Sequence, residues 1–376
     1  MDHHDALARV IRDVVAPRAV SVDRDGTFPR AAIEALGQAG ILGLISSRAM
    51  GGGGEGMVAA TDVVRQLAQA CGSTAMVLMM HYAATAVIEA HGPTETREAI
   101  ASGRHLTTLA FSEAGSRSHF WAPLSTAQAE DGEVVLRAEK SWVTAAGEAD
   151  SYVWSSRPLS ADGPMTLWLV PKDAAGLRVT ALFDGLGLRG NASSPMSATG
   201  VRVPKDARLG DDGAGLDIAL AVALPWFLVL NAAASVGLMQ AAVAETRAHL
   251  IETRLEHLDQ SLAQQPLIRS AFARMCVDTD RADALLSDTL AALALERQDA
   301  QLRVLEVKAA AGEAAVDVTD AAMRVCGGAA FRKELGIERR FRDSRAARVM
   351  APTTDALLDF IGRATCGLPL LEEAPA

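Results

Sequence analysis

The sequence predicts an α+β fold in three successive parts: a helical N-terminal domain (1–105), a middle β-domain (106–210) and a C-terminal helical bundle (211–376). Alanine- and leucine-rich segments with helical periodicity occupy both ends of the chain. Between them lie short runs rich in Val, Thr, Tyr and Trp, with no helix from one run to the next. This order favours a small antiparallel sheet or barrel, because a parallel sheet needs helices between its strands.

Four helices are predicted in the N-terminal domain, over residues 5–19, 29–39, 58–70 and 73–90. Gly40 ends the second helix, Gly72 ends the third, and Gly92-Pro93 ends the fourth. The glycine run after Met50 is expected to be a flexible loop. Because no Lys-Ser/Thr follows this run, it lacks the signature of a phosphate-binding loop.

Four β-type runs are predicted in the middle domain, at 134–138, 151–156, 165–170 and 177–182. Asp131-Gly132, just before the first run, is a typical hairpin turn. Residues 185–190 match the G-x-G-x-x-G pattern of dinucleotide-binding folds. The NASSP sequence that follows cannot begin the helix that this motif requires, so we do not expect a nicotinamide site.

Four helices are predicted in the bundle, over 216–249 with a break at Pro225, 266–300, 302–326 and 353–363. Thr353 or Thr354 is expected to be the N-cap of the last helix. The stretch 218–244 carries no charged residue and is long enough to span a bilayer. Polar residues interrupt it and neither flank carries a Lys/Arg cluster, so we expect a buried bundle helix and no membrane partner.

The composition and net charge of the chain exclude several classes of protein. Apolar residues make up 49% and charged residues 22% of the chain, which is typical of a folded globular protein. The formal net charge of −10 argues against nucleic acid as a partner. The four cysteines lie far apart with no C-x-x-C pair, which argues against a zinc or disulfide framework. Together with an N-terminus that lacks the apolar core of a signal peptide, this predicts a cytoplasmic protein.

Hydroxyl and aromatic side chains mark the middle domain as a candidate binding surface. The residues are Ser112, Glu113, Ser118, Trp142 and Thr144. Hydroxyls at strand ends can bond the edge of a flat ring such as a flavin, and an indole can cover its face. Judged by composition alone, ordinary strand residues facing solvent are the better interpretation. His81 lies in an apolar run, where a hydrogen-bonded core histidine is the simplest interpretation.

Several stretches resemble motifs of the acyl-CoA dehydrogenase flavoproteins, in the order found in that family. FSEAGSRSH (111–119) resembles "TEPxAGSD", and EKSWVTAAGEAD (139–150) resembles "KxWITNGxxAD". GLGLRGNASS, VRVP and LGDDGAGL then follow as in the family. Arg254 with Gln265 keeps the outline of "RxxFG…Q". VCGGAAF (325–331) resembles "QxxGGxGF", and FRDSR (341–345) resembles "YRDAR", so the resemblance covers nearly the whole chain.

The resemblance implies the fold of this family, with a C-terminal four-helix bundle, and a homodimer or homotetramer that binds FAD. Ser112 and Thr144 would hydrogen-bond the isoalloxazine, and Trp142 would pack on it. Ser118 would lie near the pantetheine or acyl thioester, and Arg254 of a neighbouring subunit would contact the FAD phosphates or adenine end. The other cofactor-binding positions implied by the motifs are Gln265, Arg324, Gly327, Gly328 and Thr353.

Members of the family oxidise an acyl-CoA or acyl-carrier thioester between Cα and Cβ. A glutamate removes the α-proton while a hydride passes to flavin N5, and an electron-transfer flavoprotein or O2 accepts the electrons. In this chain Ala351 stands at the usual glutamate position, and Phe227 stands at the alternative position on the first bundle helix. Four further motif residues differ from the family: His119, His257, Leu258 and Arg324.

Three functions are compatible with these departures. The first is a thioester dehydrogenase with a relocated base, for which Glu113 and Asp355 are candidates. The second is a flavin-dependent monooxygenase of the same fold, which uses reduced flavin and O2 and needs no α-proton base. His81 or His119 could then lie near the flavin, and an apolar pocket of Phe227, Met350 and Ala351 would exclude water. The third is a non-catalytic flavin-binding protein.

Overall fold

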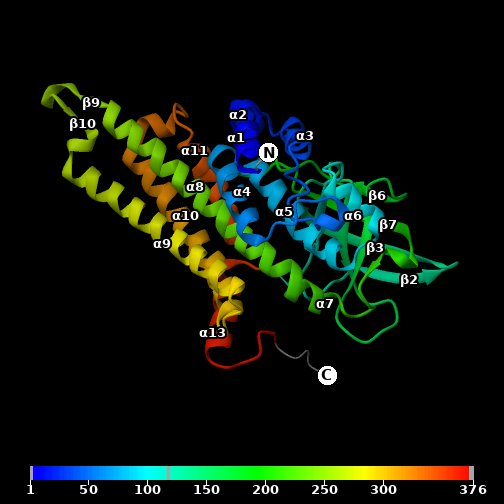
Figure 1. The fold of residues 1–376 in the computed structure, drawn as a ribbon. Helices are drawn as coiled ribbons and strands as arrows, with labels where there is room; N and C mark the ends of the chain where they lie inside the picture. The colour runs from blue at the N-terminus through cyan, green and yellow to red at the C-terminus, as the bar shows by residue number, and fades with distance from the viewer. Residues whose placement is uncertain (1–2, 117–118, 372–376) are drawn as a thin grey trace. The chain divides into compact units, whose positions relative to one another are not determined.

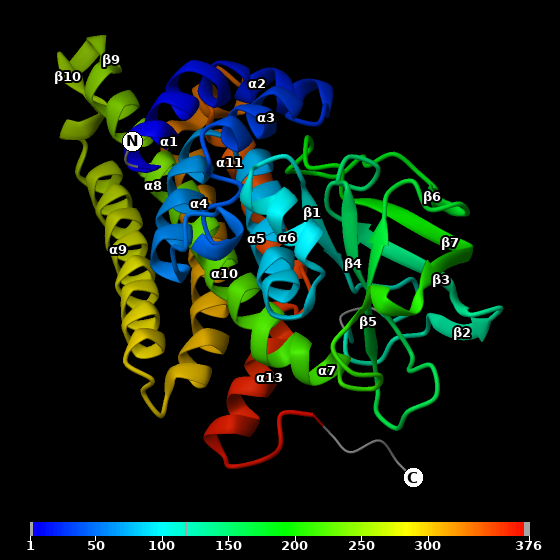
Figure 2. The same cartoon turned by 45° about the vertical axis from the view of Figure 1, so that its right-hand side comes forward.

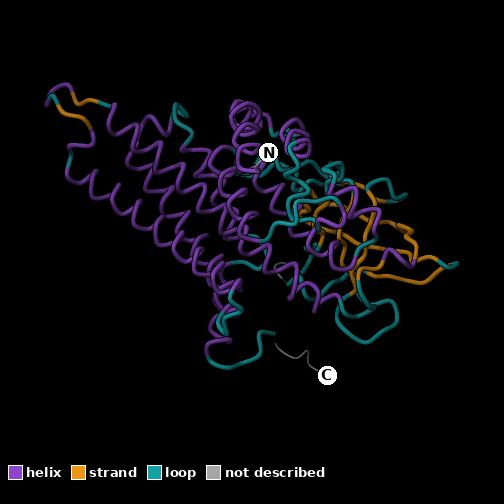
Figure 3. The backbone as a smooth tube through the Cα atoms, viewed as in Figure 1, coloured by secondary structure: helices purple, strands orange, loops and turns teal. Residues whose placement is uncertain are grey.

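The computed structural model describes residues 3–116 and 119–371 and divides into two compact units, each described by itself. The first unit comprises Met1–Val64, Ser73–Gly185 and Arg189–Phe227. The second comprises Arg65–Gly72, Leu186–Leu188 and Leu228–Ala376. Figure 3 shows the strands gathered in the middle of the chain, apart from one small hairpin among the later helices. This α–β–α order of elements is the one that the sequence predicts.

The N-terminal helices are α1 (His3–Val10), α2 (Ala16–Asp25), α3 (Arg30–Gln38), α4 (Met57–Ala70), α5 (Gly72–His91) and α6 (Thr94–Ala101) (Figure 1). A π-helical turn at Ile11–Val15 joins α1 to α2, and Gly26 ends α2 in the left-handed conformation that favours glycine. The predicted helix 5–19 therefore continues to Asp25. Helix α6 was not predicted, because Pro93 ends one helix and also begins the next.

Two four-stranded sheets form the middle part. The first has the order β1 (Thr107–Ala110), β4 (Ser151–Ser156), β5 (Thr166–Pro171), β8 (Arg208–Leu209). The second has the order β2 (Thr126–Glu130), β3 (Glu133–Val143), β7 (Ser194–Pro204), β6 (Leu177–Val179). Strands β1 and β4 are parallel, so the prediction of a purely antiparallel sheet was wrong at this pair. No strand was predicted at β1, whose partner lies far along the chain.

The C-terminal helices are α7 (Gly215–Ile218), α8 (Leu224–Glu252), α9 (Pro266–Ala294), α10 (Ala300–Phe331), α11 (Ile337–Ser344), α12 (Ala346–Val349) and α13 (Thr354–Thr365). In the second unit α8, α9 and α10 run side by side as long helices (Figure 1 and Figure 2). The break predicted at Pro225 is a π-helical turn, Ala219–Ala223, after which α8 continues through the proline. A wider turn ahead of a proline accommodates its ring and its missing N–H.

Within the described residues, one helical segment, Gly215–Glu252, is long and apolar enough to cross a membrane. In its most apolar window 67% of the residues are buried inside the fold. A core helix of a bundle satisfies the same criteria of length and hydropathy, because its neighbours cover it on most sides.

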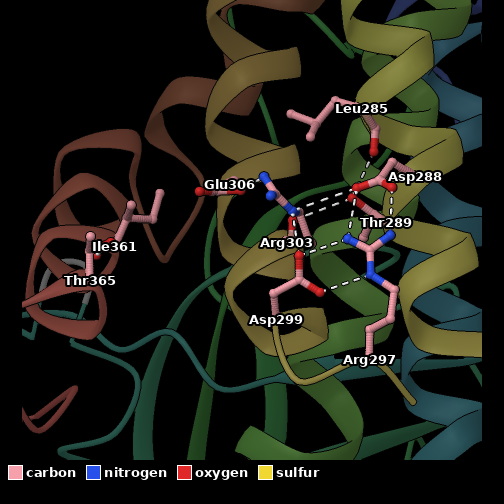
Figure 4. Close-up of polar contacts among 9 residues, drawn as sticks. All are labelled: Leu285, Asp288, Thr289, Arg297, Asp299, Arg303, Glu306, Ile361 and Thr365. Atoms are coloured by element: carbon pink, nitrogen blue, oxygen red, sulfur yellow. Dashed lines mark hydrogen bonds and ion pairs between the residues drawn. The ribbon is translucent and has the colours of Figure 1, made fainter. Parts of the chain in front are cut away.

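An ion-pair network joins the end of α9 to the start of α10 (Figure 4). Arg297 in the connecting turn pairs with Asp288 at 2.6 Å and with Asp299 at 2.7 Å. Arg303 on α10 pairs with Asp299 at 3.1 Å and with Glu306 at 2.7 Å. Because each aspartate and arginine is only partly exposed, the network fixes the turn between the two helices more firmly than single surface pairs would.

Candidate functional site

Trp142 lies at an irregularity in β3. The register between β3 and β7 shifts between Lys140 and Val143, and Trp142 takes a positive φ of 56°. The residue is 69% exposed, and its ring meets that of Phe183 edge to face, with centroids 6.4 Å apart. A tryptophan in the left-handed region is strained, and such strain is often found at binding sites. The first unit therefore presents a flat aromatic face on its surface.

Hydrogen bonds fix the residues that flank Trp142 in the chain. The Ser112 carbonyl accepts the amide N–H of Ser141 at 2.9 Å, which fixes Ser112 beside the bulge. On its other side the buried Thr144 hydroxyl lies 3.1 Å from that of Ser193. The structure thus places Ser112 beside the strand segment that carries Trp142 and Thr144. Ser118, the residue predicted to lie near the thioester, falls outside the described residues.

Glu113 lies in a buried polar network rather than in an open pocket. Its carboxylate accepts the Lys140 ammonium at 2.5 Å, the backbone amides of Leu124 and Ser125, and the Ser125 hydroxyl. Burial alone would raise the pKa of Glu113, but Lys140 and these donors outweigh burial and lower it. Both oxygens are occupied and the charge is paired, so the geometry does not support the predicted role of Glu113 as a base. Its role is to fix the loop that carries Ser112.

His81 is a core residue, in agreement with the simplest interpretation of its sequence context. Its Nδ1 accepts the Thr107 amide at 3.1 Å, and Nε2 lies 3.0 Å from the Leu42 carbonyl, so it carries the proton. Burial lowers the pKa of His81 to about 4. Because both ring nitrogens are used, a role for His81 at a flavin is not supported. His119 is exposed, and its Nδ1 lies 3.0 Å from the Ser116 carbonyl.

The segment Met350–Pro352 contains Ala351, which stands where the family motif has a glutamate. Ala351 is half-buried, and the Lys308 ammonium of α10 donates to the carbonyls on either side of it, Met350 at 3.1 Å and Pro352 at 2.8 Å. Lys308 is fully buried, and no carboxylate of the described residues lies within ion-pair distance of it. Burial therefore lowers the pKa of Lys308 to about 7.

Two predicted residues follow this segment at the start of α13. The Thr353 hydroxyl accepts the Ala356 amide at 3.4 Å, which confirms Thr353 as the N-cap. Asp355 is exposed in the first turn of α13, near Arg348. In the first unit, Phe227 is buried near the start of α8.

The remaining cofactor-binding candidates lie at a hairpin and at a break in α10. Arg254 begins the hairpin of β9 (Arg254–Leu255) and β10 (Gln260–Ser261), and its guanidinium pairs with the Asp259 carboxylate. Gln265 donates to the Gln260 side chain at 2.9 Å. Gly327 interrupts α10 with a backbone conformation open only to glycine, and a Cβ at Gly327 or Gly328 would meet nothing within 4 Å.

The predicted cofactor-binding residues differ in how well their surroundings suit a dinucleotide such as FAD. In the first unit, the exposed side chain of Trp142 suits a flat ring. In the second unit, the open backbone at Gly327 and Gly328 suits a closely approaching chain of atoms. Arg324 is also exposed one turn before the glycines. Arg254 fits less well, because Asp259 already neutralises the charge that a phosphate would need. Among the described residues no cluster of three or more His, Cys, Asp and Glu side chains could hold a metal ion.

Sequence reasoning missed two buried polar residues of the second unit. Lys308 stands in the alanine-rich core face of α10, and Asn231 stands in the uncharged stretch of α8. A single ionisable or amide side chain within an otherwise apolar helical face was the available signal. The role of each side chain depends on its contact with the Met350–Pro352 segment. The sequence alone does not show that this distant segment lies beside them.

Comparison with known proteins identifies three family models along the chain. The N-terminal, middle and C-terminal domain models of acyl-CoA dehydrogenases match residues 2–103, 108–201 and 213–366. The chain is similar to the human short-chain specific acyl-CoA dehydrogenase of mitochondria, with 28% identity over 364 residues. That match covers 94% of this chain and 87% of the relative.

Solved structures share the fold at lower identity. Butyryl-CoA dehydrogenase from Megasphaera elsdenii has a TM-score of 0.90 and 20% identity, and the match covers 97% of this chain and 100% of that chain. The FAD complex of PigA has a TM-score of 0.88 and 20% identity, and the match covers 98% of this chain and 100% of that chain. At this identity the two structures establish the fold alone.

Proposed function

Because the chain belongs to the acyl-CoA dehydrogenase family, whose members are flavin oxidoreductases, we propose that it oxidises an acyl thioester between Cα and Cβ with FAD as its cofactor. The observation that carries this proposal is Trp142, an exposed side chain held at an irregularity of β3, beside the Ser112 backbone that bonds Ser141 and two residues before Thr144. Such a surface suits one face and one edge of a flat conjugated ring.

We expect different residues of the chain to bind different parts of the cofactor. Trp142 would pack on the isoalloxazine, and Ser112 and Thr144 would hydrogen-bond its edge. In the second unit, Gly327 and Gly328 would allow a phosphate chain to approach closely, because a Cβ at either would meet nothing within 4 Å. Arg254 would come from a second copy of the chain, so the proposal includes a homodimer or homotetramer. When bound, FAD supplies the acceptor for the hydride that leaves the β-carbon.

The α-proton needs a base, and Asp355 is the candidate that we retain. Ala351 and Phe227 have no ionisable group, Glu113 is paired with Lys140, and both His81 nitrogens are hydrogen-bonded. Asp355 is a carboxylate four residues after Ala351 and is exposed. If it acts as the base, Asp355→Asn slows thioester oxidation by a factor of about 10²–10⁴ without loss of FAD.

An anaerobic titration tests this function. The FAD-loaded protein is mixed with acyl-CoA thioesters of increasing chain length and with an acyl-carrier thioester, and the visible flavin absorbance is followed. Bleaching by any of these thioesters is the expected result, and an electron-transfer flavoprotein should then restore the oxidised spectrum. Absence of bleaching across the panel contradicts the proposal, and failure to retain FAD contradicts the cofactor assignment.

A flavin-dependent monooxygenase is the second candidate, favoured by one specific observation. Both usual base positions, Ala351 and Phe227, carry side chains that cannot take up a proton. A monooxygenase needs no such base, and an apolar lining that excludes water would suit its reaction with O2. The distinguishing measurement supplies chemically reduced FAD and O2, and looks for oxygen incorporation into a substrate that fails to bleach the oxidised enzyme.

A further inference from the structure

Asn231 is a buried amide whose hydrogen bonds are incomplete. It lies on α8, is 2% exposed, and its neighbours in sequence are apolar. Its Oδ1 is buried without a hydrogen-bond partner among the described residues. Its Nδ2 donates to the Met350 thioether at 3.3 Å, and a thioether sulfur is a weak acceptor. Neither half of this carboxamide is therefore well satisfied within the folded chain.

An unsatisfied amide in a core lowers stability, whereas an aliphatic side chain of similar shape would not. Buried polar groups in folded proteins nearly always have a partner, and an exception calls for a specific explanation. A ligand group that completes the hydrogen bonds when it binds would supply that explanation.

The position of Asn231 identifies the part of a ligand that it would meet. The amide contacts Met350, which directly precedes Ala351, the usual base position of the family. Lys308 fixes this segment through the carbonyls of Met350 and Pro352. Asn231 also follows Phe227, the alternative base position, by one turn of the same helix. Within the second unit, Asn231 thus adjoins the segment that carries the usual base position.

We propose that Asn231 is a specificity-determining residue that hydrogen-bonds a hydroxyl group on the acyl chain, close to the reacting carbons. The substrate class is then a hydroxyacyl thioester rather than a plain alkyl thioester. A hydroxyl both donates and accepts, so it can serve Oδ1 and Nδ2 in either orientation of the amide. This inference rests on the proposed function, because it concerns the acyl group that the same site would take.

The energetic consequence is a strong preference between closely similar ligands. A site built to bond a hydroxyl rejects the analogue that lacks it, since its own polar group then stays unpaired. By contrast, an apolar pocket discriminates only weakly against an added hydroxyl. The preference should therefore depend on Asn231 and disappear with its carboxamide.

The test compares the FAD-loaded wild type with Asn231→Leu, using butyryl-CoA and its 2-, 3- and 4-hydroxy derivatives. Gln240→Leu is the matched control, an amide-to-leucine change on the same helix at a side chain that bonds Gln69 instead. Binding is measured as the ligand-induced shift in Tm and by calorimetry, and oxidation as anaerobic bleaching. We expect at least one hydroxyacyl-CoA to bind the wild type at least tenfold more tightly than butyryl-CoA.

In Asn231→Leu this ratio should fall to about one, with FAD retained and an unliganded Tm equal to or above that of the wild type. Gln240→Leu should keep the ratio. Equal binding of all four thioesters by the wild type, or an unchanged ratio in Asn231→Leu, overturns the inference and leaves an enclosed water as the partner of Asn231. Hydroxyacyl preference without bleaching contradicts only the proposed oxidation, and binding of no thioester contradicts both.

Discussion

The Nζ atom of Lys140 lies 2.5 Å from Oε1 of Glu113, with both side chains buried inside the first unit. Lys140 also donates to the carbonyl and the hydroxyl of Ser155, each at 2.8 Å. The pair joins the loop that carries Ser112 to the strand that carries Trp142 two residues later. Glu113, a candidate proton acceptor in the sequence, is therefore an anchor of the loop that carries Ser112.

Glu113→Gln should lower stability without removing catalysis. Breaking a buried pair leaves the Lys140 charge without its partner and should cost about 3 kcal/mol. We expect a clear fall in the free energy of unfolding, measured with urea, and normal turnover per FAD-loaded molecule at low temperature. Lys140→Met should be similarly costly, and the double variant should cost less than the sum of the two. A loss of turnover of 10²-fold or more in stable, FAD-loaded Glu113→Gln would restore the base assignment.

Lys308 should make stability depend on pH in the alkaline range. Its pKa is lowered from 10.5 to about 7 because burial disfavours the ammonium. Below about pH 7 the amine is protonated in both the folded and the unfolded chain, and the cost of burying the charge is constant. Between about 7 and 10.5 only the unfolded chain holds the proton, so stability rises with pH, by at most about 1.4 kcal/mol per unit.

The measurement is urea unfolding of the wild type and Lys308→Met at pH 7, 8 and 9. Other groups also titrate in this range, so the informative quantity is the difference between the two proteins. The free energy of unfolding of the wild type should rise relative to that of Lys308→Met as the pH increases. Parallel pH dependences would mean that the folded chain keeps the amine protonated up to pH 9, with a partner beyond the carbonyls of Met350 and Pro352.

Asp259 should weaken FAD binding by competing for Arg254. Their side chains are paired and largely exposed, so the guanidinium is held by its own hairpin rather than presented to a phosphate. Asp259→Asn should tighten FAD binding several-fold, and Arg254→Ala should weaken it tenfold or more, in fluorescence titrations of the deflavinated protein. Asp278→Asn, which removes another exposed arginine partner, is the control for net charge. Weaker binding by Asp259→Asn would show that the pair orients Arg254 instead.

Local sequence signals predicted most of the helices. They failed where contacts between distant parts of the chain determine the structure. Thr353 caps α13 as predicted, because capping depends on a hydroxyl three residues before an amide. Pro225 was predicted to break a helix, but one π-helical turn absorbs its ring. The parallel pairing of Thr107–Ala110 with Ser151–Ser156 could not be predicted, because nothing near either strand specifies the other.

The candidate site shows the same limit. Trp142 and Thr144 belong to one motif, and the hydrogen bond from the Ser141 amide to the Ser112 carbonyl joins the second motif to it. The environment of Glu113 was not predictable, since Lys140 and Ser125 reach its carboxylate only after the β-domain has folded. Lys308 and Asn231 were missed for a related reason, as their partners lie in the Met350–Pro352 segment more than 40 residues further along the chain than Lys308.

Restoring a carboxylate at Ala351 should increase thioester oxidation if the rest of the site is intact. Ala351 is half-buried between two carbonyls that Lys308 holds, so the backbone that would carry a glutamate is already fixed. Ala351→Glu should raise the rate of anaerobic flavin bleaching by the preferred thioester, by about 10²-fold or more if no other base operates. Ala351→Gln, equal in size but unable to take up a proton, should not. An equal rate in the wild type and Ala351→Glu would mean that a base already serves the reaction, and Asp355→Asn then identifies whether it is Asp355.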